Sequence, residues 1–153
     1  NVRQKVTIFT DGACSNNPGV GGFAAILIYN SIEKIVVGGE KLTTNNRMEL
    51  TAVIKGLSVL KEPCEVKLHS DSQYIVDAFT KGWIEDWQKR GWKTAAKKEV
   101  KNIDLWEELL RLTKIHSVEF VKVKGHSDVD YNNRCDELAR EEVKRISSSC
   151  IDD

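Results

Sequence analysis

The sequence has no long apolar run of the kind that forms a membrane-spanning helix. Its longest apolar stretch is FAAILIY at residues 23–29, whereas a bilayer crossing takes about 20 residues. A basic and then apolar N-terminus that ends in a cleavage site, the pattern of a secretory signal peptide, is also absent. These two absences argue against a membrane protein and lead us to expect a cytoplasmic location.

Cysteine is too sparse and too irregularly spaced to organise the fold. The four cysteines, Cys14, Cys64, Cys135 and Cys150, include no C-x-x-C pair. Zinc sites and disulfide frameworks usually show regular cysteine spacings, so neither is predicted here. Free thiols are also what a reducing compartment favours.

The chain has no excess of either charge, but its charges are unevenly distributed. Lys and Arg together number 23, as do Asp and Glu, so the formal net charge is zero. Residues 89–101, KRGWKTAAKKEVK, hold six basic residues against one acidic residue, which gives this segment +5 and leaves −5 for the remainder. A local basic patch of this kind indicates a surface that binds phosphates.

The order of apolar patterns predicts one α/β domain that spans residues 1–153. The first three strands are expected to form an antiparallel meander, and helical crossovers join the later ones. Residues 147–153 are expected to fray. Strands are predicted at residues 6–10, 23–29, 34–39, 65–70 and 117–124. Helices are predicted from Thr44 to Pro63, at 72–83, near 103–112 and at 134–146.

Four acidic residues stand at positions where an α/β domain forms sites. Asp11 and Asp71 are predicted to end the first and fourth strands, and the ligand sites of open α/β sheets lie at the carboxyl ends of strands. Glu49 lies in the first helix and Asp136 in the first predicted turn of the last one. Taken singly, each acid is explained equally well as a turn former, a solvated helix residue or a favourable charge at a helix N-terminus.

The chemistry of the four acids depends on whether they converge. Clustered carboxylates raise one another's pKa unless a cation is bound, and an all-oxygen set suits Mg²⁺ or Mn²⁺. Two such ions, about 4 Å apart, cleave phosphodiester bonds in many nucleases. One ion then activates the attacking water while the other stabilises the leaving 3′ oxygen.

Short motifs surround these acids in a fixed order. They are F-T-D-G at Asp11, T-N-N-R-M-E-L at Glu49, S-D-S-Q-Y at Asp71, and K-G-H at His126 followed by N-x-R-C-D-E-L-A at Asp136. In this order and at these spacings they resemble the bacterial type 1 ribonuclease H (ribonuclease HI) family. The resemblance runs from about Val6 to Lys144 and includes WQKRGWKT, which is similar to the basic protrusion of that family.

The resemblance implies an endonuclease that hydrolyses the RNA strand of RNA:DNA hybrids and leaves 5′-phosphate and 3′-hydroxyl ends. It implies a five-stranded mixed sheet in the order 3-2-1-4-5, with helices on both faces. Asp11, Glu49, Asp71 and Asp136 occupy the metal-ligand positions of the family, for two Mg²⁺ ions or, as an alternative, Mn²⁺. His126 stands where the family has a mobile histidine, thought to assist proton transfer or product release, and an imidazole suits that task.

Polar residues near the acids are candidates for recognising the RNA strand. A nuclease confined to RNA in a hybrid senses 2′-hydroxyl groups across the shallow minor groove, and neutral donors and acceptors suit that task. Each of these residues serves equally well as a cap or turn former. The candidates are Cys14 through its backbone, Asn17, Thr44, Asn45, Asn46 and Gln73.

The basic segment and the residues before it form a predicted basic protrusion, at about residues 83–101. Its cations are expected to bind phosphates of the DNA strand, and an exposed Trp to lie against a sugar or base. Alternatively, the tryptophans hold the helix of the protrusion in place and the lysines form a solvated face. Trp106 is predicted to be core, and His69 and His116 to be structural. The candidate contacts are Trp83, Lys89, Arg90, Trp92, Lys93, Lys97 and Lys98.

The sequence departs from the family pattern at residues 127–133, where S-D-V-D-Y-N-N replaces a glycine-containing loop. The departure bears on loop mobility and turnover rather than on the ligand set. The leading hypothesis is a monomeric, Mg²⁺-dependent hybrid ribonuclease with no obligate protein partner. The alternatives are a DNA-acting nuclease of the same fold, against which the amides and the protrusion argue, and a hybrid-binding module without catalysis, against which the four intact acids argue.

Overall fold

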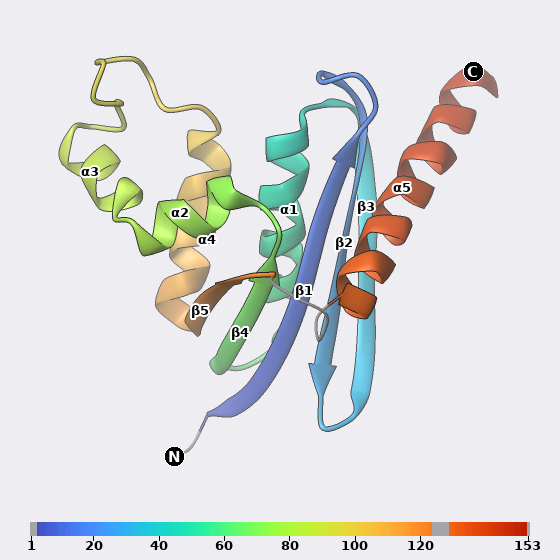
Figure 1. The fold of residues 1–153 in the computed structure, drawn as a ribbon, viewed down its shortest axis with the longest axis horizontal. Helices are drawn as coiled ribbons and strands as arrows, with labels where there is room; N and C mark the ends of the chain where they lie inside the picture. Colours follow the sequence, from blue (N-terminus) through green and yellow to red (C-terminus); the bar gives the residue numbers. More distant parts are fainter. Residues whose placement is uncertain (1–2, 124–128, 153) are drawn as a thin grey trace.

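A five-stranded mixed sheet with helices on both faces forms the protein (Figure 1). The computed structural model describes residues 3–123 and 129–152. The strands follow the order β3-β2-β1-β4-β5 across the sheet, as predicted. In chain order the elements are β1 (Gln4–Cys14), β2 (Gly19–Tyr29), β3 (Ile32–Thr43), α1 (Asn45–Ser58), β4 (Cys64–Ser70), α2 (Gln73–Thr80), α3 (Trp83–Lys89), α4 (Ile103–Ile115), β5 (Ser117–Lys122) and α5 (Val129–Asp152).

The two halves of the sheet pair differently. β1, β2 and β3 form the antiparallel meander, whereas β4 and β5 run parallel to β1 after helical crossovers. β1 continues to Cys14, so Asp11 lies within the strand and not at its end, where the sequence pattern placed it. The pairing of β1 with β4 stops at Phe9 and His69, before Asp11 is reached. At Asp11, the edge of β1 on the side of β4 is therefore not paired with β4 and is open to other elements.

Each face of the sheet has its own apolar core, because successive residues of a strand point to opposite faces. On one face Ile8 packs with residues of α1, α2 and α4, among them the fully buried Trp106. On the other face Phe9 packs with Cys135 of α5. Figure 1 shows α5 by itself on one side of the sheet and α1 and α4 on the other.

The first helix begins where the sequence predicts and ends earlier. The hydroxyl of Thr44 accepts a hydrogen bond from the backbone N–H of Arg47 at 3.2 Å, which satisfies one of the unpaired donors at the start of α1. The helix ends at Ser58, ahead of the predicted end at Pro63.

The last helix is longer than predicted at both ends. α5 begins at Val129 and not at Arg134, so Asp136 lies about two turns inside the helix and not in its first turn. It continues to Asp152, through residues for which fraying is predicted. No helix in the described ranges combines the length and apolar character needed to cross a membrane.

Gly12 allows α1 to approach β1 closely. A Cβ atom at this position would lie 2.5 Å from the backbone nitrogen of Glu49 and 2.5 Å from the carbonyl carbon of Met48. Any side chain at residue 12 would therefore push α1, and Glu49 with it, away from β1.

We expect Gly12→Ala to lower the free energy of unfolding by about 2 kcal/mol, because overpacking a tight contact displaces the backbone. Urea unfolding followed by circular dichroism measures this change. Gly56→Ala is the matched control, since its new Cβ would meet only side-chain atoms, at 3.2 and 3.4 Å. An equal loss in both variants would contradict the steric reason.

Candidate active site

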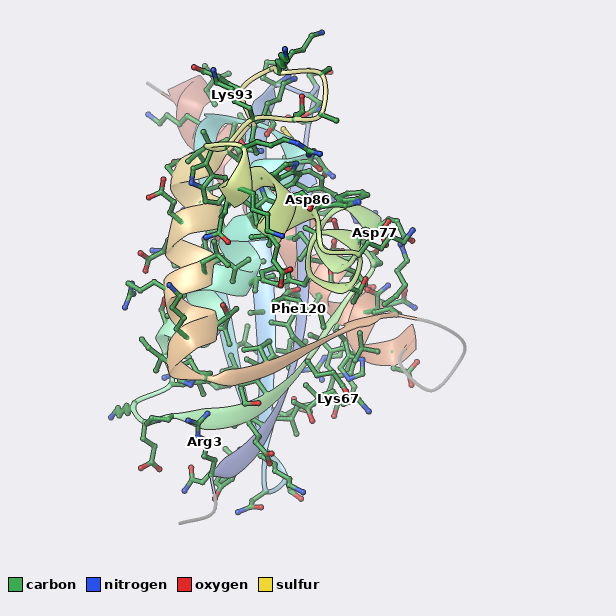
Figure 2. The ribbon with its side chains drawn as sticks, turned by 90° about the vertical axis from the view of Figure 1, so that its left-hand side faces the viewer. Arg3, Lys67, Asp77, Asp86, Lys93 and Phe120 are labelled. Carbon is green, nitrogen blue, oxygen red and sulfur yellow. The ribbon has the colours of Figure 1, made fainter. Side chains whose placement is uncertain are left out.

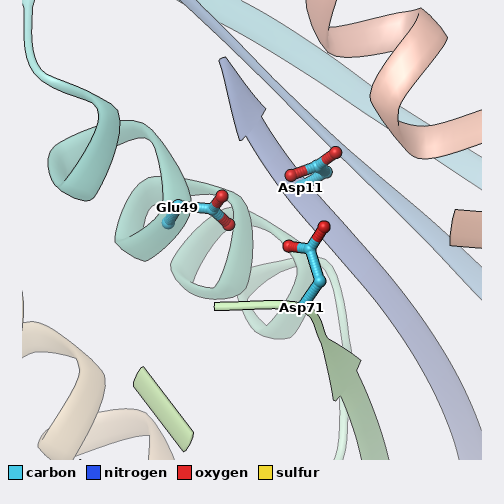
Figure 3. Close-up of side chains that lie close together, drawn as sticks. All are labelled: Asp11, Glu49 and Asp71. Atoms are coloured by element: carbon cyan, nitrogen blue, oxygen red, sulfur yellow. The ribbon is translucent and has the colours of Figure 1, made fainter. Parts of the chain in front are cut away.

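Three of the four predicted acids converge beside the open edge of β1 (Figure 3). Asp11 comes from β1, Glu49 from the first half of α1, and Asp71 from the residue that follows β4. One carboxylate oxygen from each lies within 4.8 Å of those of the other two. The side chains are separated widely in sequence, so the sheet register and the contact at Gly12 bring them together.

The cluster places two of its three carboxylates where water is largely excluded. Asp11 and Glu49 are buried and Asp71 is exposed. Burial and then the charge of Asp71 raise the pKa of Asp11 to about 7, although a hydrogen bond with Glu49 and another from the backbone N–H of Gly12 oppose the rise. Burial, followed by the charges of Asp11 and Asp71, raises the pKa of Glu49 well above its ordinary value.

The donor set fits a hard divalent cation. The Oε2 atom of Glu49 is buried and has no hydrogen-bond partner in the described part of the chain, which is unusual for a buried carboxylate oxygen. The cluster consists of oxygen ligands alone, the set that Mg²⁺ and Mn²⁺ prefer. A bound cation would supply the missing partner of Glu49 and offset the burial and the neighbouring charges that raise the pKa of Asp11 and Glu49.

The fourth predicted ligand, Asp136, does not join the three-acid cluster. Its side chain is partly exposed on α5, and its Oδ2 atom pairs with Arg140 one turn further along, at 2.8 Å. Asp136 is still close enough for its charge to contribute to the raised pKa of Asp11. The structure therefore brings three acids together and leaves the fourth beside them.

Several candidates for recognising the RNA strand lie around the start of α1. Thr44 caps the helix, and Asn45 and Asn46 are exposed in its first turn. The Oδ1 atom of Asn17 accepts a hydrogen bond from the backbone N–H of Asn45 at 2.9 Å, so the turn after β1 is tied to α1. The half-buried Cys14 is the last residue of β1, directly before this turn. The cap and turn explanation therefore holds for Thr44 and Asn17.

The backbone around Asp71 is held by a residue that sequence reasoning did not identify. The ammonium group of Lys122 donates a hydrogen bond to the carbonyl oxygen of Asp71 at 2.7 Å. The parallel register of β4 and β5 sets this contact, since it pairs Lys122 with Ser70, and no local motif signals it. Gln73 follows Asp71 at the start of α2, and its amide donates to the carboxylate of Asp77.

The basic protrusion combines an anchored apolar side with a solvated basic side. Trp83 and Trp92 are half-buried against the main core, so packing is a role for both. Trp87 meets the buried Trp106 edge-to-face, with ring centroids 5.5 Å apart. Lys89, Arg90, Lys93, Lys97 and Lys98 are all exposed, and Figure 2 shows Lys93 at the end of the molecule opposite to Arg3.

The sequence assigns two kinds of role to the histidines, structural for His69 and His116 and catalytic for His126. His69 and His116 are buried, and the Nδ1 atom of His116 accepts a hydrogen bond from the backbone N–H of Cys64 at 3.1 Å, which agrees with structural roles. His126 lies outside the described residues.

The RNase H family model matches residues 3–144 of the chain. The chain belongs to the RNase H family. It is 62% identical over 144 residues to the ribonuclease H of Acetivibrio thermocellus, and the match covers 94% of this chain and 98% of the relative. It is 58% identical over 146 residues to the ribonuclease H of Chlorobium chlorochromatii, with 95% of this chain and 100% of the relative covered.

Solved structures of the family share the fold. LC9-RNase H1, described as a type 1 RNase H with the type 2 active-site motif, has a TM-score of 0.81 at 29% identity, over 93% of this chain and 73% of that one. LC11-RNase H1, solved in complex with an RNA/DNA hybrid, has a TM-score of 0.69 at 22% identity, over 92% and 98%. The predicted family and fold are thereby confirmed.

The raised pKa of Asp11 leads to a test of stability in the absence of divalent ions. An ordinary Asp titrates at 3.8 and the folded Asp11 at about 7, so the folded state holds this proton more tightly. The stability that this proton contributes is fully present below about pH 4 and is lost as the pH rises through 7. We therefore expect Asp11→Asn to stabilise the protein by roughly 2 to 4 kcal/mol at pH 8 and far less at pH 4.

Urea unfolding in EDTA at the two pH values measures this difference. Asp77→Asn is the control, because Asp77 is also buried but is paired with Gln73 and Lys81. That substitution should lower stability at pH 8. If Asp11→Asn also lowered it there, the clustered carboxylates would not be a source of strain.

Proposed function

We propose that the protein hydrolyses the RNA strand of RNA:DNA hybrids with divalent cations held by Asp11, Glu49 and Asp71. The observation that carries the proposal is the convergence of three carboxylates, one of which has a buried oxygen without a partner in the described part of the chain. Family membership and the names of the relatives, each called ribonuclease H, support the reaction.

The residues of the cluster have separate tasks. Asp11 and Glu49 are buried and rigidly held, one by a strand and the other by a helix packed on Gly12, so they fix the position of a cation. Asp71 is exposed and therefore faces incoming substrate. Bound Mg²⁺ would activate the attacking water and stabilise the leaving 3′ oxygen, giving 5′-phosphate and 3′-hydroxyl ends.

Mg²⁺ is proposed as the resident ion, two per site once substrate is bound, and Mn²⁺ is the expected substitute because both prefer oxygen ligands. Asp136 of α5 is proposed as the fourth ligand. It lies close enough to Asp11 for its charge to help raise the pKa of that residue. His126 is proposed to assist proton transfer, on the strength of its motif.

Recognition of a hybrid requires contacts to both strands. Asn45, Asn46 and Gln73 are exposed amides close in sequence to Glu49 and Asp71, and we assign them to the 2′-hydroxyl groups of the RNA strand. The turn that follows Cys14 and carries Asn17 is tied to α1, and we assign it to the same surface. The structure of LC11-RNase H1 with an RNA/DNA hybrid supports this substrate class.

The basic protrusion is proposed to bind phosphates of the DNA strand. Its exposed cations stand on a scaffold anchored by tryptophans, so their positions relative to the acid cluster are fixed. Because the rest of the chain has a net charge of −5, this local positive charge is what attracts the duplex. We expect the protein to work as a monomer in the cytoplasm.

The first test of this function is cleavage of labelled hybrids in Mg²⁺. We expect the RNA strand to be cut and the DNA strand to remain intact. Asp11→Asn, Glu49→Gln and Asp71→Asn should each reduce cleavage to background, because each removes a charged cation ligand. Asp104→Asn, at an exposed acid paired with Arg47, is the control and should retain cleavage.

The same assay separates the competing functions. Double-stranded DNA and double-stranded RNA are supplied alongside the hybrid, and we expect both to remain uncut. Cleavage of double-stranded DNA at a comparable rate would favour the DNA-acting alternative. Binding of the hybrid without cleavage would favour the inactive module.

The role of the protrusion predicts a change in salt dependence. Replacing Lys97 and Lys98 by Ala should weaken hybrid binding and reduce the slope of log Kd against log salt by about 1 for each phosphate that is no longer bound. Fluorescence anisotropy with the Asp11→Asn protein measures this on intact hybrid. Lys34→Ala with Lys61→Ala, at lysines that lie together near Gln4, is the matched control, and an equal change there would leave the protrusion without a specific role.

A further inference from the structure

Three aromatic rings form a continuous stack across the sheet face that α5 covers. The rings of Phe9 and His69 lie 4.5 Å apart with planes inclined by 13°, and those of Phe9 and Tyr131 lie 4.9 Å apart with planes inclined by 18°. Phe9 and His69 are paired residues of β1 and β4, so the spacing of neighbouring strands sets the first contact. Tyr131 extends the stack into the first turn of α5.

Each ring belongs to an element that carries or adjoins one of the four acids. Phe9 precedes Asp11 by two residues, and His69 precedes Asp71 by two. Tyr131 lies on α5, which also carries Asp136. The stack therefore joins β1, β4 and α5 next to the cluster, although none of the three rings is itself a cation ligand.

Tyr131 is fixed by more than its ring. Its hydroxyl donates a hydrogen bond to the carboxylate of Glu33 on β3 at 2.9 Å, and Arg134 donates to the same carboxylate at 3.1 Å. The guanidinium group of Arg134 lies over the Tyr131 ring, 5.5 Å from its centroid. The buried thiol of Cys135 donates to the carbonyl oxygen of Phe9 at 3.3 Å.

These contacts come from one face of one helical turn. Residues 131, 134 and 135 are spaced by three and four positions and so point the same way. Together they hold the start of α5 to β1 and β3, which opposes sliding or rotation of the helix. Asp136 follows Cys135 directly, and its charge already acts on Asp11.

We propose that Tyr131 is a positioning residue, which sets the place of Asp136 relative to Asp11, Glu49 and Asp71 through its ring contact with Phe9. The proposal rests on the proposed function, since it concerns the same cation site. It also explains how Asp136 is held in place although the residues around Tyr131 depart from the family pattern. The Tyr131 ring and its hydrogen bond to Glu33 fix the position of the start of α5.

The test compares Tyr131→Leu, which removes the ring, with Tyr131→Phe, which keeps the ring and removes the hydroxyl. Phe120→Leu is the matched control, because Phe120 stacks on Phe79 at 4.0 Å, between β5 and α2. All variants are also made in the Asp136→Asn background. Unfolding by urea, Mn²⁺ binding by calorimetry without substrate, and kcat and KM on the hybrid are measured for each.

Tyr131→Leu is expected to weaken Mn²⁺ binding by about 10-fold or more, the range found when groups that orient metal ligands are removed. It should lower kcat while the KM for the hybrid stays unchanged. Tyr131→Phe should keep most of the Mn²⁺ affinity and kcat of the unsubstituted protein, because the stack remains. Phe120→Leu should lose stability without changing Mn²⁺ affinity or kcat.

The background variant decides whether Tyr131 acts through Asp136. In Asp136→Asn protein, Tyr131→Leu should cause no further loss of Mn²⁺ affinity, since the group that it positions is gone. An undiminished loss in that background, or equal losses of affinity in Tyr131→Leu and Phe120→Leu, would overturn the proposal. The calorimetric comparison does not need hybrid cleavage, so it remains decisive even if the wild-type protein leaves hybrids intact.

Discussion

The burial of clustered carboxylates is the constraint on which the rest of the structure depends. Asp11 and Glu49 are held out of water and within reach of Asp71, and this burial together with the neighbouring charges raises the pKa of both buried acids. A chain that only needed stability would replace such a group with an apolar side chain. The arrangement is useful when a divalent cation supplies the opposite charge, because the ligands are then already in place and need little reorganisation on binding. The free energy lost in the metal-free protein thus becomes affinity for the ion.

The site exists because the pairing of two strands ends before one of them does. β1 and β4 separate after Phe9 and His69 while β1 continues alongside β2, so Asp11 has an open side in an otherwise continuous sheet. At the next residue α1 approaches β1 closely because Gly12 has no side chain. The close contact is the reason that a helical residue, Glu49, reaches a strand residue. The backbone of the sheet and one missing Cβ atom together position the cluster.

Local patterns predict the acids and most elements, but not the contacts that set the boundaries. Asp11 is expected at the end of a strand because D-G usually begins a turn, whereas pairing with β2 carries β1 on to Cys14. The residues before Arg134 are polar and predict a loop, yet Tyr131 is held in α5 by Phe9 and Glu33. Both differences arise from partners distant in sequence, which periodicity does not reveal. The convergence of three acids is predictable because strand order follows from the resemblance, while the separate place of Asp136 depends on where α5 begins.

The uneven distribution of charge divides the work of binding between two regions. In the proposed function, the acid cluster and the body with a net charge of −5 would repel a polyanion, and the segment at residues 89–101 with its charge of +5 would attract it. At physiological ionic strength electrostatic interactions are screened beyond about 8 Å, so the protrusion acts on the phosphates that it touches and not on the whole duplex. It must therefore stand at a fixed place relative to the cluster. The edge-to-face contact of Trp87 with the buried Trp106 joins the protrusion to the same core against which α1 packs. If the protrusion binds the hybrid as proposed, its apolar side is therefore as necessary for binding as its lysines.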